Sequence, residues 1–241
     1  MRNVVVTGGG TGIGKAVAAT FARLGDDVVI TGRRAEVLAK TAAELGANVR
    51  AVAFDATDPD QVEAALAELP ETVHVLVHSA GGNTSIGAPE PATLSETAAA
   101  WRANLDANVI SAVLVTTALR PRLAPGGTVI NISSIAAHRG GAGSYGAAKA
   151  AVEAWNLTLA QDLGRDQITA NVIAPGFIDD TEFFRGRMTD ERRATLIGQT
   201  ANGRAGVPDD IAAAAQFLAS PGGSHITSQV LHINGGALSG R

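Results

Sequence analysis

The first fourteen residues restrict the possible folds of this chain more than any other segment does. Asn3–Thr7 reads Asn-Val-Val-Val-Thr, a short apolar run typical of a buried strand. Five glycines follow before residue 15, and a helical pattern of apolar residues then runs to Gly25. A glycine-rich turn between a strand and a helix lets the backbone approach a pyrophosphate, which the helix N-terminus attracts. The segment therefore predicts a dinucleotide-binding unit.

Strand-like and helix-like segments alternate along the rest of the chain. Most of the strand-like segments are continuous apolar runs, which suits a parallel sheet covered on both faces. The expected strands are 3–7, 27–31, 48–54, 73–79, 127–132, 169–174 and 229–233, and the expected helices are 35–45, 59–69, 93 to about 120, 144–163 and 208–218. The alternation predicts an α/β fold, a three-layer doubly wound parallel sheet of the Rossmann type, as a single domain over residues 1–241.

Composition argues against several classes of function. The formal net charge is -4 and no basic run occurs, so neither nucleic acid nor an anionic membrane is an expected partner. No signal peptide and no apolar run of membrane-spanning length is evident. The chain has no cysteine, and its five histidines lack a metal-binding spacing, so we expect no metal site. We expect a cytoplasmic protein that acts on a small molecule.

The residues that follow the strands are expected to share one rim, because ligands of such sheets bind beyond the carboxyl ends of the strands. These residues are Gly8–Gly14, Gly32–Arg34, Asp55–Ala56, His78–Gly82, Ser133–Ser134 and Pro175–Thr181. The only tyrosine, Tyr145, precedes Lys149 by four residues, so both would lie on one face of a helix. A nearby cation lowers the pKa of a phenol, which makes the pair a plausible proton donor.

Together these motifs resemble the short-chain dehydrogenase/reductase family over nearly the whole chain. They occur in the family's order: Gly8-x-x-x-Gly12-x-Gly14, Asp55, Ala80-Gly81, Asn108, Ile132-Ser133-Ser134, Tyr145-x-x-x-Lys149, Asn171 to Pro175-Gly176, and Asn234-Gly235-Gly236. Within the family, the overall similarity is to 3-oxoacyl-(acyl-carrier-protein) reductases and related carbonyl reductases. The resemblance implies an NADP(H)-dependent oxidoreductase that interconverts a ketone and a secondary alcohol.

The resemblance also implies the catalytic roles. Tyr145 would donate a proton to the carbonyl oxygen as hydride arrives, or accept one in the reverse direction. Lys149 would bind the nicotinamide ribose and lower the pKa of Tyr145. Ser134 would hydrogen-bond the carbonyl oxygen, and Asn108 would support a water relay to Lys149.

Two of these assignments have rivals nearby in the sequence. Ser133 remains a rival of Ser134. Asn104 lies near the slot given to Asn108, which is preferred because it follows Trp101 at the family's usual interval.

The choice of cofactor depends on the residues after the second strand. NAD-binding relatives usually place an acid there, whereas this chain has Gly32 followed by Arg33 and Arg34, whose guanidinium groups can pair with a 2′-phosphate. NADP(H) is therefore expected over NAD(H). The other cofactor contacts implied by the resemblance are Gly8, Thr11, Gly12, Ile13, Gly14, Asp55, Ala56, Ala80, Gly81, Tyr145, Lys149, Pro175, Gly176 and Ile178.

Three departures from the family pattern are visible. The loop at 136–143 is shortened, and His78-Ser79 stands where the family usually has two asparagines, so that strand end must be stabilised differently. Ser228 replaces a frequent glycine, with no consequence expected. His138 is expected to be an exposed loop histidine rather than a site residue.

Two larger features follow from the resemblance. The long irregular stretch 176–206 would form a substrate lid, and the two longest helices would pack against other subunits to give a homotetramer. Three other functions share parts of this pattern: a non-catalytic dinucleotide sensor of the same fold, an extended nucleotide-sugar epimerase and a methyltransferase. Retention of Tyr145 and Lys149 argues against the sensor, the short chain after Pro175 against the epimerase, and the combination with Ser134 against the methyltransferase.

Overall fold

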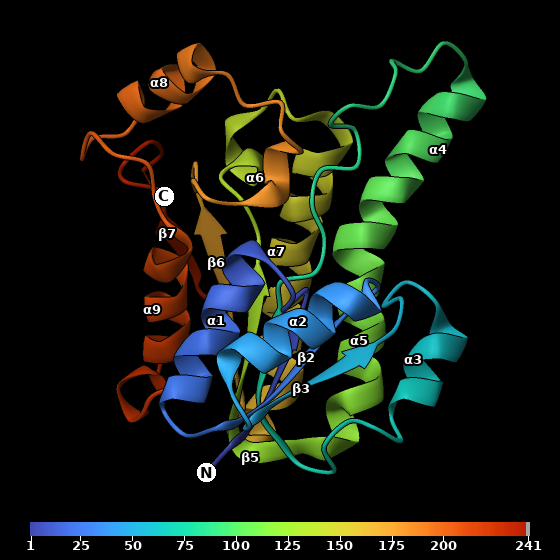
Figure 1. Cartoon of the computed structure of the whole chain (residues 1–241), viewed down its shortest axis with the longest axis vertical. Helices are drawn as coiled ribbons and strands as arrows, with labels where there is room; N and C mark the ends of the chain where they lie inside the picture. Colours follow the sequence, from blue (N-terminus) through green and yellow to red (C-terminus); the bar gives the residue numbers. More distant parts are fainter. Residues whose placement is uncertain (240–241) are drawn as a thin grey trace.

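All seven predicted strands pair in one parallel sheet in the computed structural model, which describes residues 1–239 (Figure 1). The strands are β1 (Asn3–Thr7), β2 (Asp27–Gly32), β3 (Val49–Ala53), β4 (Val73–His78), β5 (Leu123–Ile132), β6 (Thr169–Pro175) and β7 (Val230–Ile233). Their order is β3-β2-β1-β4-β5-β6-β7, so the direction of winding reverses between β1 and β4. This confirms the predicted doubly wound fold and places its ligand-binding crevice at the carboxyl ends of these two strands.

Helices cover both faces of the sheet. They are α1 (Gly12–Arg23), α2 (Ala35–Leu45), α3 (Pro59–Ala65), α4 (Leu94–Leu105), α5 (Ser111–Leu119), α6 (Ala136–Arg139), α7 (Gly143–Leu163), α8 (Asp190–Gly198) and α9 (Pro208–Leu218). In Figure 1, α1 and α9 pack against each other on one side of the sheet, whereas α5 and α3 lie on the opposite side. The rod formed by α4 and α5 extends well beyond the edge of the sheet (Figure 1).

The core consists of two apolar layers separated by the sheet. Alternation along β1 sends Val4 and Val6 to one layer, where they pack with Phe21 of α1. Val5 points to the other layer, which contains Leu119 of α5. Burial on both faces explains why the strands are continuous apolar runs in the sequence.

Four helical segments differ from expectation. The helix expected at 59–69 ends at Ala65, where a turn follows α3. The helix predicted from 93 to about 120 is interrupted by a π-helical turn, η1 (Asp106–Ile110). The expected irregular stretch 176–206 contains α8, whose charged sequence hides any apolar periodicity and whose N-terminus is capped by Thr189. The expected loop 136–143 begins with the short helix α6. No helix within residues 1–239 has the length and apolar character needed to cross a bilayer.

Candidate active site

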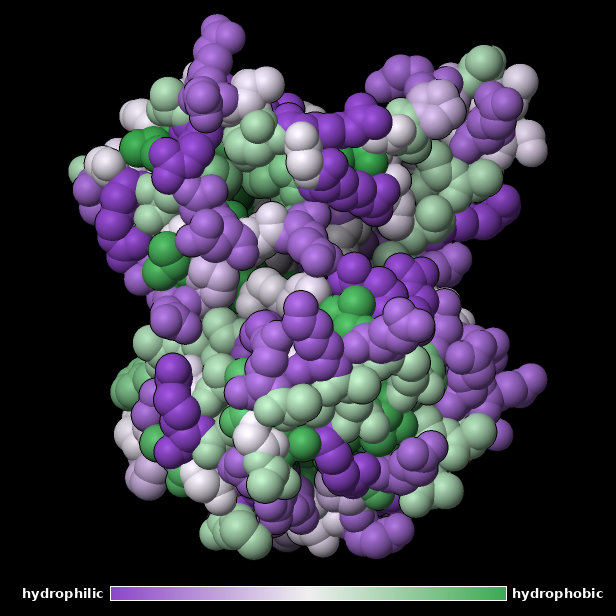
Figure 2. Space-filling model, viewed as in Figure 1, coloured by the Kyte–Doolittle hydropathy of each residue, from purple (hydrophilic) through white to green (hydrophobic). Residues whose placement is uncertain are grey.

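One cavity of about 840 Å³ lies beyond the carboxyl ends of the strands, within the size range of about 300–1,000 Å³ that is usual for ligand sites. The surface is hollowed there, between α2 and the segment that precedes α8 (Figure 2). Every residue predicted to contact the cofactor lines this cavity, as do Ser134, Tyr145 and Lys149. Asn108 does not line it. The scattered sequence motifs therefore converge in space.

The glycine turn forms one end of the cavity and fits a pyrophosphate. Gly12 adopts a left-handed φ of 50° at the start of α1, which glycine does without steric cost. A Cβ atom added to Gly14 would lie 2.2 Å from the carbonyl oxygen of Gly8, so the turn and helix approach more closely than a side chain permits. Because the N-terminus of α1 lines the cavity, its free N–H groups can receive an anion.

Two arginines stand at the end of β2, beside the same cavity. Arg33 Nη1 lies 3.9 Å from Asp55 Oδ2, and Arg34 Nη2 lies 2.8 Å from Glu182 Oε2. Asp55 is also fixed by Thr57, whose N–H and hydroxyl donate to its Oδ1 at 3.0 and 2.8 Å. The guanidinium groups thus present positive charge where the ribose of the adenine half of a dinucleotide would lie.

Tyr145 and Lys149 project from the first turns of α7, and both side chains are buried. The Nζ atom of Lys149 donates a 2.8 Å hydrogen bond to the carbonyl oxygen of Ile132 and lies 5.8 Å from the centre of the Tyr145 ring. Burial lowers the pKa of Lys149 to about 8, opposed by the charge of Glu153.

The lowering of the Tyr145 pKa by Lys149 stays a prediction, because burial outweighs other influences on this phenol in the structure. Burial raises the pKa of Tyr145 to about 12, because removal of water disfavours the phenolate. The hydroxyl of Ser134 is the group that opposes this rise. The phenol is therefore held in its protonated, proton-donating form.

The two neighbouring serines face different partners. Ser133 is buried and donates to Glu153 Oε1 at 2.6 Å, with the carbonyl oxygen of Lys149 at 3.2 Å. Ser134 accepts a 3.1 Å hydrogen bond at its Oγ from the N–H of Ala136. Its hydroxyl is also the group that lowers the pKa of Tyr145, against the effect of burial. The geometry therefore favours Ser134 over its rival as the group that meets a substrate carbonyl.

Asn108 and Asn104 hold the loop that follows β4. Asn108 lies in the π turn, where its Nδ2 donates to the carbonyl oxygens of Gly82 and Asn104, and its Oδ1 accepts from the N–H of Gly82. Asn104 accepts from the N–H of Thr84 and donates to Ser144 Oγ at 2.9 Å. Both amides thus order the wall of the cavity, and the water relay assigned to Asn108 stays a prediction.

Two histidines near the cavity differ in burial, His78 being buried at the end of β4 and His138 exposed as expected. His78 Nε2 lies 2.7 Å from Thr116 Oγ1, and burial lowers the pKa of this histidine to about 3, so the ring is neutral. The N–H of Ala80 donates to Thr7 Oγ1 at 3.2 Å, which ties the end of β4 to β1. Contrary to expectation, His138 lies on α6 rather than in a loop, and its Nε2 is 2.6 Å from Glu153 Oε2.

Sequence reasoning missed Glu153, which links Ser133, His138 and the charge of Lys149. The available signal was its position four residues after Lys149, on the same face of a helix whose other members there are buried. Ser228 was also misjudged, because its φ of 64° is left-handed, and glycine would adopt that conformation without strain.

The segment before α8 covers the cavity. Phe183 packs on Tyr145 with the ring centres 5.7 Å apart. The methyl group of Thr181 would lie 3.5 Å from a Cβ atom added to Gly12. The segment therefore spans the cavity from the glycine turn to the buried tyrosine.

These features define a class: a Rossmann-type oxidoreductase with a dinucleotide cleft and a buried tyrosine–lysine pair. A family model described as Enoyl-(Acyl carrier protein) reductase matches residues 8–237. The 3-oxoacyl-(acyl-carrier-protein) reductases of Chlamydia trachomatis and Vibrio cholerae are 36% and 33% identical to the chain, covering 98% and 96% of it and 96% and 95% of their own lengths. The chain belongs to the short-chain dehydrogenase/reductase family.

A solved structure agrees with this assignment. A short chain dehydrogenase from Burkholderia cenocepacia in complex with NADP has a TM-score of 0.87 and 32% sequence identity, and the match covers 98% of this chain and 97% of that one. The presence of NADP in that protein supports the prediction of NADP(H) as the cofactor.

Proposed function

We propose that the chain is an NADP(H)-dependent oxidoreductase that interconverts a ketone and a secondary alcohol. The observation that carries the proposal is the convergence of Tyr145, Lys149 and Ser134 on the cavity whose other end carries Arg33 and Arg34. The cofactor would supply or accept the hydride, and the protein's part is position, charge and proton transfer.

Each of the three residues has its own role in the proposed reaction. Ser134 donates a hydrogen bond to the carbonyl oxygen and stabilises the negative charge that develops there. Tyr145, a phenol that stays protonated at neutral pH, gives its proton to that oxygen. Lys149, the buried cation beside Tyr145, stabilises the phenolate that remains and binds ribose hydroxyls.

The lid and substrate proposals are connected. We propose segment 176–206 as the substrate lid, because Phe183 within it touches Tyr145 and the rings of Phe177 and Phe184 lie 5.9 Å apart beside it. Such an aromatic cover suits an apolar substituent next to the reacting carbonyl. The names of the similar reductases indicate a 3-oxoacyl thioester as the first substrate to test.

The direct test is oxidation of NADPH, followed at 340 nm, with a panel of 3-oxoacyl thioesters, simple ketones, sugars, steroids and a 2-enoyl thioester. We expect turnover with a ketone and none with the 2-enoyl thioester, because Tyr145 and Ser134 would protonate and hydrogen-bond an oxygen, whereas reduction of the enoyl C=C bond places the proton on carbon. NADPH should exceed NADH by at least about tenfold in kcat/KM, about 1.4 kcal/mol. Binding of NADPH without turnover of any ketone would favour a non-catalytic sensor, and equal use of NADH would overturn the cofactor preference.

A further inference from the structure

Glu182 pairs with the arginine that is expected to hold a phosphate. The carboxylate Oε2 lies 2.8 Å from Arg34 Nη2, although 148 residues separate the two in the chain. Both residues line the dinucleotide cavity, so the contact lies inside the proposed cofactor site. A carboxylate and a phosphate seek the same donors on a guanidinium group.

The lid fixes the position of this carboxylate from both sides. Thr181, one residue earlier, covers Gly12 of the glycine turn, and Phe183, one residue later, packs on Tyr145. The short stretch is bounded by Asp180 and Arg185, which both have left-handed φ values, 56° and 50°. Non-glycine residues adopt such values infrequently, and the two turns they form present Glu182 to Arg34.

The two arginines would attract an arriving phosphate, whereas the carboxylates paired with them would repel it. Arg34 faces Glu182 at 2.8 Å and Arg33 faces Asp55 at 3.9 Å. A 2′-phosphate would have to replace Glu182 on Arg34 and would meet the repulsion of that carboxylate if it stayed close. A 2′-hydroxyl carries no charge and would meet neither obstacle.

We propose that Glu182 is an internal competitor of the 2′-phosphate for Arg34, and that it reduces the preference of the site for NADP(H) over NAD(H). This proposal rests on the proposed function, because it takes Arg34 as the phosphate-binding residue. The side chains of Arg34 and Glu182 are 58% and 61% exposed, so water screens the pair and the expected effect is modest.

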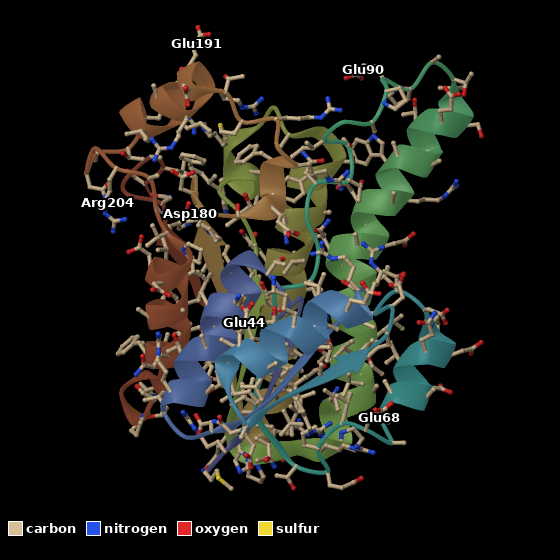
Figure 3. The ribbon with its side chains drawn as sticks, viewed as in Figure 1. Glu44, Glu68, Glu90, Asp180, Glu191 and Arg204 are labelled. Atoms are coloured by element: carbon tan, nitrogen blue, oxygen red, sulfur yellow. The ribbon has the colours of Figure 1, made fainter. Side chains whose placement is uncertain are left out.

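The test compares Glu182→Gln with the unaltered protein by isothermal titration calorimetry, using NADP+, NAD+ and adenosine 2′,5′-bisphosphate. We expect NADP+ and the bisphosphate to bind about three- to fivefold more tightly to the variant, with NAD+ unchanged. In an Arg34→Ala background, Glu182→Gln should change nothing. Glu191→Gln is the matched control, because it removes one charge from α8, where Glu191 points away from the body of the molecule (Figure 3).

The outcomes separate this proposal from the function on which it rests. Unchanged NADP+ affinity in Glu182→Gln, with a clear loss in Arg34→Ala, would overturn the competition and leave the cofactor assignment intact. Weaker NAD+ binding in Glu182→Gln would also overturn it, since Glu182 would then bind the ribose hydroxyl. If Arg34→Ala did not weaken NADP+ binding, the phosphate-binding role of Arg34 would itself be wrong.

Discussion

Lys149 Nζ lies 5.8 Å from the centre of the Tyr145 ring, and both side chains are buried on one face of α7. This arrangement places a cation beside the only phenol in the chain. Because the chain has no other tyrosine, spectroscopic signals of tyrosine report on Tyr145 alone.

Replacement of Tyr145 by Phe removes one oxygen and keeps the ring that packs on Phe183. We expect kcat to fall by about 10²-fold or more, the usual scale for loss of a general acid, with folding and NADP+ affinity nearly unchanged. Steady-state kinetics on the best substrate of the panel and calorimetry measure the two effects. Near-normal turnover would show that the proton comes from another group.

The neighbouring serines offer a matched pair. Ser134→Ala should lower kcat while cofactor binding and stability stay the same, because its hydroxyl faces the reacting oxygen. Ser133→Ala should instead lower the free energy of unfolding by about 1–3 kcal/mol, because Oε1 of the buried Glu153 carboxylate loses the Ser133 hydroxyl that donates to it. Kinetics and urea unfolding of both variants test this. The reverse pattern would exchange the roles of the two serines.

The ionisation of Tyr145 can be followed by tyrosinate absorbance near 295 nm. With a pKa of about 12, the protein should show almost no tyrosinate at pH 10, where a free tyrosine would be half ionised. Because the folded state keeps a proton that the unfolded state loses near pH 10, stability should fall as pH rises from about 10 to about 12. Saturating NADP+ should shift the ionisation to lower pH. Half ionisation at pH 10 in the folded protein, without NADP+, would contradict the burial effect.

We predict a homotetramer of about 98 kDa, four times the 24.4 kDa of one chain. Trp101 of α4 and Leu157 of α7 are 45% and 51% exposed, on the helices expected to contact other subunits. Leu157→Glu should reduce the assembly to smaller species, whereas Leu24→Glu, which alters an equally exposed leucine after α1, should not. Light scattering that gives 24 kDa at micromolar concentration would refute the prediction.

Ser228→Gly should stabilise the protein. The residue has a φ of 64°, and its hydroxyl makes no hydrogen bond to another group within residues 1–239. Glycine would therefore relieve backbone strain and remove no hydrogen bond. We expect a gain of about 0.5–1 kcal/mol after allowing for the greater freedom of glycine in the unfolded chain. Ser224→Gly, at a right-handed φ of -63°, is the control and should destabilise. Thermal unfolding of both variants decides the matter, and an equal loss in both would contradict strain at Ser228.

Both the fold and the convergence of the site residues could be predicted from the sequence, because both depend on the pattern of parallel strands. Parallel strands carry the residues that follow them to one edge of the sheet, so Gly8, Ser134 and Pro175 could be placed together without coordinates. The expected helix start at residue 93 also agrees with the structure, in which Thr93 and Glu96 form a complete capping box.

Contacts between distant or polar segments were out of reach. The Glu182–Arg34 pair joins residues 148 apart, and neither has a periodic signal. Helix α8 was missed because its charged residues give no apolar stripe. The balance of burial against charge at Tyr145 depends on how deeply the ring is enclosed, and this follows from packing rather than from the spacing to Lys149.

The π turn at Asp106–Ile110 limits the insertions and deletions that this part of the chain can tolerate. Each residue of an α-helix turns the chain by about 100°, so the extra residue of a π turn rotates all of α5 relative to α4. Deletion of a single residue here would restore a regular helix, but it would swing Asn108 away from Gly82 or Trp101 away from its present face. Substitutions in this turn should therefore be milder than any one-residue deletion, and insertion or deletion events should be rare in this segment while they accumulate in the loops.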